Sequence, residues 1–446
     1  MALDRESLEI LARALKKLDA GFAHLPDFAS AVPGGARMEE VMLALAEKLQ
    51  DNYPYFHPMY AGQMLKPPHA VARLAYSLAM YINPNNHALD GGRATSALEK
   101  EAVAEIAGMF GWKEFLGHLC GGGTMANLEA LWVAGQIHPG KTILASDQAH
   151  YTHARISGVL QLPFEKVQAD ARGRMDVNAL AGRVARGDVG TVVATLGTTA
   201  TGSIDSLPEI LELREKFGLR VHVDAAYGGY FVLASNLGES AQKSFARIGE
   251  ADSVVIDPHK HGLQPYGCGC VIFRDTGVGK LYRHDSPYTY FSSAELHLGE
   301  ISLECSRPGA AAAALWATQR LLPLVRGGEF AGELERGREA ALQFFRAIES
   351  NEKFLAAFEP ELDILVFVPK GDSIEKISAK SQRIFEATAR EGLHLAVAEL
   401  PVKFWSSLKP ESGRATVKCL RSVLMKPEHL ECVGRIVSVL ESCSGD

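Results

Sequence analysis

The sequence lacks the features of several protein classes. No Cys-x-x-Cys pair occurs among its seven cysteines, which argues against a zinc site or a disulfide framework. It has no basic run, and its net charge is −7, so a nucleic-acid surface is not expected. The most apolar stretch, 308–325, contains Gln319 and Arg320, and residues 1–15 carry charges throughout, so neither a membrane span nor a secretory signal is expected. We therefore expect a reduced, cytoplasmic protein without a metal.

What is present indicates a folded enzyme-sized chain. Hydrophobic residues make up 47% and charged residues 22% of the 446 residues, which excludes wholesale disorder and leaves room for two or three domains. Apolar residues at helical spacing predict an N-terminal helical segment over 1–90. Helical patterns then alternate with short β-branched strands, which predicts an α/β domain with a mostly parallel sheet over 91–310. A smaller α+β domain is expected over 311–446.

The elements that support this division are predicted as follows. Helices are expected at 7–19, 38–49, 95–109, 124–136, 176–186, 207–217, 374–391 and 427–440, and in two long stretches between 308 and 350. Strands are expected at 142–145, 191–196, 219–223, 253–256, 268–273, 363–368 and 414–420.

A glycine run opens one of the predicted helices, in Cys120-Gly-Gly-Gly-Thr-Met-Ala-Asn127. The first N–H groups of a helix have no partner within it and carry the positive end of the helix dipole, so they bind anions, and glycine lets a phosphate approach the backbone. The run matches neither a Walker motif nor Gly-x-Gly-x-x-Gly. An ordinary glycine turn with a threonine cap explains it equally well when it is read alone.

An aspartate ends a buried strand in Val221-His-Val-Asp-Ala-Ala-Tyr-Gly-Gly229. Asp224 thus stands at the edge where α/β sheets place ligands, and a carboxylate there needs a cation or hydrogen bonds to offset its burial. The small residues after it leave room for a flat molecule. The alternative is a helix cap or a structural ion pair.

A lysine follows another apolar strand in Asp257-Pro-His-Lys-His-Gly262. Partial burial would lower the pKa of Lys260 and make its amine a candidate for a Schiff base, although a single lysine is usually a solvated surface residue. His150, in Ser146-Asp-Gln-Ala-His150, is placed to stack on a flat cofactor, and Leu196-Gly-Thr-Thr199 ends a strand at the same edge. Read alone, each of these two has a structural explanation.

Together these features describe pyridoxal 5'-phosphate, bound by its aldehyde, ring nitrogen, ring face and phosphate. The sequence also resembles the fold-type I, group II pyridoxal-phosphate amino-acid decarboxylases. The blocks 146–150, 194–199, 222–227 and 258–260 are similar to those of aromatic-L-amino-acid decarboxylases, and Asp257 to Leu263 is similar to archaeal tyrosine/aspartate decarboxylases. The resemblance runs from about His57 onward and implies an α/β fold of that type.

The resemblance also implies a role for each matching residue. Lys260 corresponds to the lysine that forms the Schiff base, Asp224 to the partner of the pyridine nitrogen, His150 to the stacking histidine and Ala226 to the small residue on the opposite ring face. Positions around the phosphate or the ring substituents are matched by Gly123, Thr124, Thr199 and His259. Asp257 departs from the animal enzymes, which have Asn there, and leaves its contact with a phosphate in question.

The implied reaction is loss of CO2 from an L-amino acid, with a tyrosine from a loop as proton donor. Tyr288 is the first candidate and Tyr290 the second, although either tyrosine could equally serve packing or a subunit contact. Such loops commonly reach a neighbouring subunit, so the resemblance implies a homodimer.

The substrate is the least determined point. The aromatic segments 53–60 and 288–291 favour an aromatic amino acid such as tyrosine. An acidic substrate, aspartate or glutamate, would need a cation such as Arg93, Arg307 or Lys66. Other possibilities are a carbon–carbon lyase similar to the sphingosine-phosphate lyases, an aminotransferase, and a non-catalytic homologue that binds the cofactor.

Overall fold

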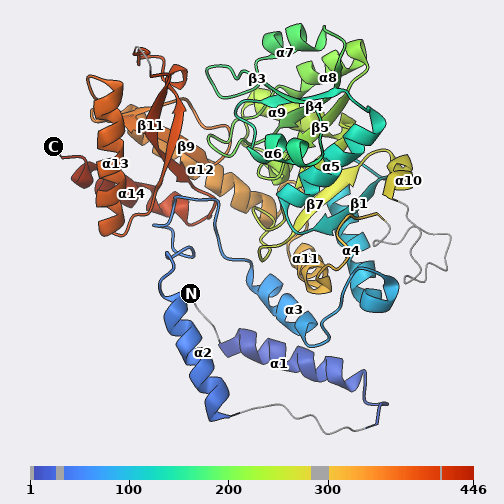
Figure 1. Cartoon of the computed structure of the whole chain (residues 1–446). Coiled ribbons are helices and arrows are strands. Elements are labelled where there is room, and N and C mark those ends of the chain that lie inside the picture. The colour runs from blue at the N-terminus through green and yellow to red at the C-terminus, as the bar shows by residue number, and fades with distance from the viewer. Residues whose placement is uncertain (1–4, 27–34, 283–300, 412–413, 446) are drawn as a thin grey trace.

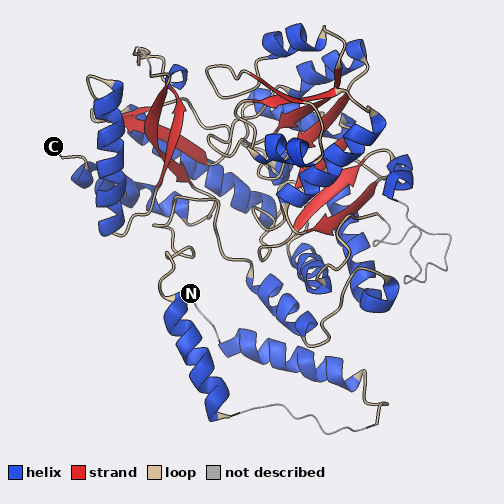
Figure 2. Cartoon of the chain, viewed as in Figure 1, coloured by secondary structure: helices blue, strands red, loops and turns tan. Residues whose placement is uncertain are grey.

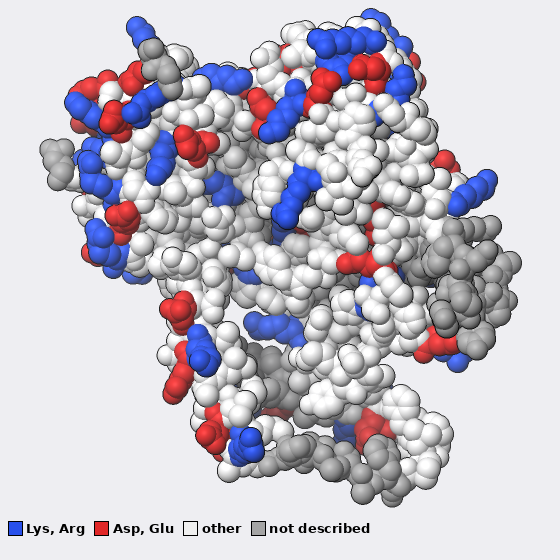
Figure 3. Space-filling model, viewed as in Figure 1, with Lys and Arg blue, Asp and Glu red and all other residues white. Residues whose placement is uncertain are grey.

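A computed structural model of the chain describes residues 5–26, 35–282, 301–411 and 414–445. These residues form a large α/β body, a smaller sheet with its own helices, and two helices that extend away from both (Figures 1 and 2). Acidic and basic side chains are interspersed over the face shown in Figure 3. Within the described ranges, no helix has the length and apolar character needed to cross a bilayer.

The large body is built on a seven-stranded sheet in the order β1-β7-β6-β5-β4-β2-β3. The strands from β3 to β6 pair in parallel, whereas β7 is antiparallel to both of its neighbours. The predicted mostly parallel α/β sheet is therefore confirmed. The strands are β1 (Leu116–Cys120), β2 (Thr142–Ser146), β3 (Phe164–Val167), β4 (Val189–Thr195), β5 (Arg220–Asp224), β6 (Ser253–Ile256) and β7 (Gly269–Phe273).

Helices cover this sheet because parallel strands need crossover connections. The helix that follows β1, α5, packs against β6 and β7 and buries seven of its fifteen residues. Helix α11 packs against α3 and α4 at the β1 side of the body (Figure 1). The helices of the body are α3 (Ala70–Met80), α4 (Leu89–Met109), α5 (Gly123–Ile137), α6 (Thr152–Val159), α7 (Val177–Val184), α8 (Leu207–Phe217), α9 (Glu239–Ala246), α10 (Gly279–Tyr282) and α11 (Gly309–Leu321).

The smaller sheet is antiparallel and has the order β10-β11-β9-β8. Helix α13 packs on β9 and β11 through isoleucines at helical spacing, and Ser373 caps its first turn by accepting a hydrogen bond from the Lys376 N–H. The elements are α12 (Glu329–Glu349), β8 (Phe354–Ala356), β9 (Ile364–Pro369), α13 (Ile374–Arg390), β10 (Ala396–Pro401), β11 (Thr416–Val423) and α14 (His429–Cys443). The domain boundaries near residues 90 and 310 stay predictions.

The N-terminal helices α1 (Arg5–Ala20) and α2 (Ala36–Leu49) contain no buried residue. Figure 1 shows them projecting below the body. Both were predicted from their apolar spacing. Helix α1 contacts α3 and half-buries Leu11, Leu15 and Leu18, whereas the apolar residues of α2 are exposed in this single chain.

Four strands escaped prediction: β1, β3, β8 and β10, which are three to six residues long. Each contains at most one β-branched residue, whereas every predicted strand contains at least two, so these segments do not stand out as strands. Strand β1 also contains Gly117, whose Cβ position would lie 2.9 Å from the Val271 carbonyl oxygen on β7. This close backbone approach, which pattern does not reveal, lets β1 pair at the edge of the sheet.

A buried carboxylate, Glu99 on α4, ties the start of the body together. Its Oε1 accepts hydrogen bonds from the Leu119 N–H at 2.9 Å and from Arg307 Nη1 at 2.6 Å, and its Oε2 accepts one from Asn86 Nδ2 at 2.6 Å. Arg307 also donates to the Leu119 carbonyl at 2.6 Å. The loop before α4, strand β1 and the segment before α11 are thus joined at one group.

We predict that Glu99→Gln lowers the free energy of unfolding by about 3–5 kcal/mol, because it leaves the buried Arg307 cation without its counter-charge. Urea denaturation followed by circular dichroism measures the change. The matched control is Glu101→Gln on the same helix, whose half-exposed carboxylate pairs with Arg320; it should cost less than about 1 kcal/mol. Equal unfolding free energies for the two variants would contradict the assignment.

Candidate functional site

A cavity of about 550 Å³ lies at the carboxyl edge of the large sheet. Strands β4, β5 and β6 end there side by side, so the residues at or just after their ends share one wall. The size is that of a small-molecule or cofactor site. The cavity is lined by all eight residues that were expected to surround the cofactor: Gly123, Thr124, His150, Thr199, Asp224, Ala226, His259 and Lys260.

The glycine loop forms the anion-binding end of the cavity. Gly122 has φ 139° and ψ 176°, a conformation that side chains essentially exclude, and it precedes the first residue of α5. No side chain caps the helix, so the first N–H groups of α5 are available to an anion. The loop also packs closely on β7, since a Cβ on Gly269 would lie 2.5 Å from the Gly122 carbonyl carbon. The threonine cap considered from sequence is not formed.

Asp224 is the buried carboxylate at the middle of the site. Its Oδ1 accepts a hydrogen bond from the Ala226 N–H at 3.1 Å, and its Oδ2 lies 2.8 Å from Nε2 of His153. Burial raises the pKa of the carboxyl group, but the hydrogen bond and charge of His153 and the charge of Lys260 outweigh it, so the pKa lies well below its usual value. Asp224 is therefore ionised across the neutral pH range.

Lys260 approaches the cavity from the turn after β6. Its Nζ lies 3.0 Å from Oδ2 of Asp257, and the His259 Nε2 lies 3.5 Å from the same oxygen. The other oxygen of Asp257 is buried without a hydrogen-bond partner in the described structure. Asp257 also faces the glycine loop, because a Cβ on Gly123 would lie 2.7 Å from its Oδ2. The ion pair with Lys260 thus compensates a negative charge at the anion-binding end.

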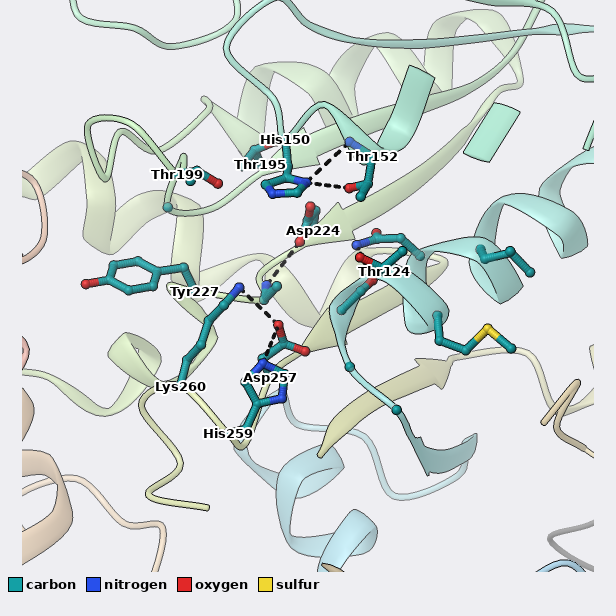
Figure 4. A pocket seen from close by; sticks show the side chains of 18 of the residues that line it. Thr124, His150, Thr152, Thr195, Thr199, Asp224, Tyr227, Asp257, His259 and Lys260 are labelled. Carbon is teal, nitrogen blue, oxygen red and sulfur yellow. Dashed lines mark hydrogen bonds and ion pairs between the residues drawn. The ribbon is translucent and has the colours of Figure 1, made fainter. Parts of the chain in front are cut away.

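His150 and Lys260 approach the cavity from opposite sides of Asp224 (Figure 4). His150 is fixed by Thr152, whose N–H donates to Nδ1 at 3.3 Å and whose hydroxyl lies 2.5 Å from the same nitrogen. Burial lowers the pKa of His150, which favours the neutral ring. A neutral imidazole with one hydrogen-bonded edge presents its face to a flat ligand.

Two hydroxyl groups at the end of β4 behave differently from expectation. Thr199 lines the cavity and is exposed, whereas its neighbour Thr198 is buried and bonded to Thr201 at 2.8 Å. Thr195, which sequence reasoning missed, also lines the cavity, and its hydroxyl has no partner in the part of the chain that is described. Its position as the last residue of β4, beside Asp224 in the sheet register, was the available signal.

These groups fit pyridoxal 5'-phosphate. The capless helix start and the glycine loop suit a phosphate, and the ionised Asp224 suits a protonated ring nitrogen. The orphan hydroxyl of Thr195 would gain a polar partner from a ring substituent. One carboxylate, Glu304, accepts a hydrogen bond from the Gly121 N–H at 2.8 Å at the edge of this loop.

The candidates for the proton donor and for the partner of an acidic substrate have different outcomes. Tyr288 and Tyr290 fall within 283–300, outside the described residues, so the proton donor stays a prediction. Arg93, Arg307 and Lys66, considered as partners of an acidic substrate, are not among the described residues that line the cavity. Arg307 is instead bonded to Glu99, and Lys66 donates to the Met425 carbonyl at 3.4 Å.

Known proteins resemble this chain in sequence and in fold. Residues 132–370 match the family described as the pyridoxal-dependent decarboxylase conserved domain. An L-tyrosine decarboxylase of Enterococcus faecium is 30% identical, with 76% of this chain and 69% of that protein covered. An L-aspartate decarboxylase of Thermococcus kodakarensis is 29% identical, with coverage of 64% and 73%. The crystal structure of mouse CSAD superposes with a TM-score of 0.80 at 20% identity and covers 99% of this chain and 100% of that chain.

We predict that Gly122→Ala weakens pyridoxal 5'-phosphate binding much more than pyridoxal binding, because the new methyl group strains the loop that faces the phosphate. The added Cβ would also lie 3.1 Å from the His259 ring. A backbone penalty of about 1–3 kcal/mol is expected in urea unfolding. Fluorescence titration of the apoenzyme with both ligands measures the binding.

The control for this loop is Gly434→Ala on α14, where a Cβ meets nothing within 4 Å. It should leave both affinities unchanged and leave stability equal or slightly higher. Unaltered phosphate-dependent affinity in Gly122→Ala would count against the loop as the anion site.

Proposed function

We infer that this chain, which belongs to the pyridoxal-dependent decarboxylase family, acts on an L-amino acid with an aromatic side chain such as tyrosine. The family is that of pyridoxal-phosphate-dependent carboxy-lyases, so the resemblance drawn from the motifs is confirmed, as are the class of enzyme and the cofactor. The choice of substrate and the roles of individual residues are the proposal.

The chemistry of the proposal needs an electron-accepting ring held in a fixed orientation. When bound, pyridoxal 5'-phosphate supplies that ring. Lys260 is the residue that attaches the cofactor, because it is the only lysine among the described residues that line the cavity. Asp224 keeps the ring nitrogen protonated, since an ionised buried carboxylate stabilises a facing cation. His150 and Ala226 hold the ring faces.

The phosphate end is assigned to the glycine loop. Gly123 and Thr124 offer the first N–H groups of α5, and His259 lies under the loop beside Asp257. In the reaction itself the substrate loses its carboxylate as CO2 and gains one proton at Cα. Tyr288 is the proposed source of that proton.

A second hollow of about 340 Å³ carries the proposal for an aromatic substrate. It shares His150, Tyr151 and Thr199 with the cofactor cavity, so the two spaces adjoin, and we assign the hollow to the substrate side chain. Much of the remaining lining is apolar, from Ala149, Ala200, Val397 and Ala398. Such a surface suits a ring better than a carboxylate.

The charged groups of this hollow point the same way. Among the described residues that line the hollow, the basic side chain is Arg421. Its guanidinium already donates hydrogen bonds to the carbonyl groups of Thr199, Ala200 and Gly62 and to the side chain of Gln63. Asp147 adds a negative charge to the same wall. A substrate carboxylate would meet no unengaged cation among the described lining residues and would face a like charge. The tyrosine decarboxylase relative agrees with this choice, whereas the aspartate decarboxylase relative keeps an acidic substrate as the second candidate.

We predict that the purified holoenzyme releases CO2 from tyrosine with a kcat/KM about 100-fold or more above that for aspartate or glutamate, because an unpaired carboxylate in the hollow costs several kcal/mol. A panel of the common L-amino acids, assayed for CO2 and amine, measures this. Preference for an acidic substrate would refute the aromatic assignment, keto-acid product would indicate an aminotransferase, and no turnover would indicate a binding homologue.

Lys260→Ala accompanies the panel and should abolish CO2 release with little change in fold. It should also lose the cofactor absorbance that borohydride removes from the wild type. Lys100→Ala, which alters an exposed lysine on α4, is the matched control and should behave as the wild type. Turnover by the Lys260 variant would count against its role.

We also propose that the enzyme is a homodimer in which α1 and α2 pack on the partner chain. Helix α2 exposes Met38, Val41, Met42, Leu43, Leu45 and Leu49, with relative accessibilities between 45% and 61%. All of these except Leu43 recur at three- or four-residue spacing and so share one helix face, and an exposed apolar face of this kind marks a protein contact. The single chain leaves it uncovered, and a second copy is the occupant that the family resemblance favours.

We predict a solution mass of twice 48.2 kDa by light scattering. Val41→Lys combined with Leu45→Lys should shift the protein towards monomer, because both charges would enter the proposed contact. Glu40→Lys on the same helix, which leaves the apolar positions intact, is the control. A monomeric wild type at micromolar concentration would refute the dimer.

A further inference from the structure

A histidine outside the cavity supports the buried carboxylate from behind. His153 is the second residue of α6, and its side chain is 1% exposed. Its Nε2 lies 2.8 Å from Oδ2 of Asp224, while the cavity lining includes Asp224 but not His153. The ring therefore contacts the carboxylate on the side away from the ligand space.

Hydrogen-bond donors to Asp224 are few. Among the described residues, His153 is the side chain that donates to it, and the Ala226 N–H is the backbone donor. A carboxylate with 7% of its side chain exposed takes up a proton unless donors or cations stabilise the charge. Since a carboxylate can only accept, Nε2 carries the shared hydrogen whichever protonation state the ring has.

We propose that His153 is a positioning residue that holds Asp224 ionised and in the orientation needed to face the cofactor's ring nitrogen. The inference rests on the proposed role of Asp224 and extends it to a residue that never touches the cofactor. Hydrogen-bonded partners behind a functional group commonly fix its geometry and charge.

The place of His153 in the chain gives it a second connection. His150 lines the cavity three residues earlier, and Thr152 bonds to its ring from the first residue of α6. One turn of chain therefore carries both the histidine that faces the ring and the histidine that supports its charge partner. Both contacts therefore depend on the start of the same short helix, which packs on α5 and β3.

The test compares His153→Leu with His153→Gln. Leucine fills much of the space without a donor, whereas a glutamine amide reaches the position of Nε2 and can still donate to Asp224. We expect His153→Leu to raise the dissociation constant of pyridoxal 5'-phosphate from the apoenzyme about 10- to 100-fold and to lower kcat by a similar factor. The KM for the amino acid should change less than about threefold, because His153 does not touch it. His153→Gln should restore most of both losses.

A purely structural role predicts a different pattern. His118 and Glu129 form another buried histidine–carboxylate pair, at 2.9 Å with both side chains 0% exposed, and neither lines the cavity. His118→Leu should therefore lower the urea midpoint while leaving cofactor affinity unchanged. If His153→Leu also lowers the midpoint with unchanged cofactor affinity, His153 is only structural and the proposal is overturned.

A double substitution with Asp224→Asn tests whether His153 acts through the Asp224 carboxylate. If His153 acts through the carboxylate, His153→Leu should change cofactor affinity by less than about twofold once Asp224 is already Asn, because the coupling partner is gone. An undiminished effect in that background overturns the proposal. If the leucine variant does not fold, His153→Asn, whose shorter amide cannot reach Asp224, takes its place beside His153→Gln, and equal affinities of these two overturn the proposal.

Failure of the proposed function would look different. A wild-type protein that binds no pyridoxal 5'-phosphate, or that binds it without releasing CO2, removes the premise. A wild type that binds and turns over normally, with His153→Leu unchanged in both respects, removes only the role of His153.

Discussion

The site depends on keeping one negative charge buried at the end of β5. Desolvation opposes that charge, and Asp224 retains it only because His153, the Ala226 N–H and the charge of Lys260 stabilise the ionised form. Each of these groups comes from a different element: α6, the turn after β5 and the turn after β6. The ionised form of Asp224 therefore depends on the correct packing of these three elements. Its negative charge in turn favours a ring that carries a proton on its nitrogen.

The parallel strands bring these groups together because their carboxyl ends lie at the same edge of the sheet. Thr195 and Asp224 are neighbours in the β4–β5 register, and Asp257 follows β6 in the next position along the sheet. The antiparallel β7 then lies between β6 and β1 and brings Gly269 against the glycine loop. A short edge of sheet thus carries the acid, the amine and the anion-binding loop within reach of one ligand.

The sequence allowed prediction of residues that stand directly after an apolar strand or before a helix. The α/β fold and the co-location of Lys260, Asp224, His150 and the glycine loop followed from that placement. His153 could not be found in this way, because its partner lies 71 residues away and a buried histidine within a helix has no local signature. Thr195 could have been found from its place at the end of β4 beside Asp224, whereas the strands β1, β3, β8 and β10 have too few β-branched residues to be recognised.

The guanidinium of Arg421 has a mechanical consequence. It projects from β11 of the smaller sheet and clasps carbonyl oxygens of Thr199, Ala200 and Gly62, which belong to the turn after β4 and to the chain before α3. An outward movement of the smaller sheet would break these hydrogen bonds at the same time. It would leave the Arg421 cation, which is 4% exposed, without its hydrogen-bond acceptors. Hinge opening between the two sheets therefore has a high free-energy cost. We expect substrate entry and product release to involve segments that Arg421 does not contact.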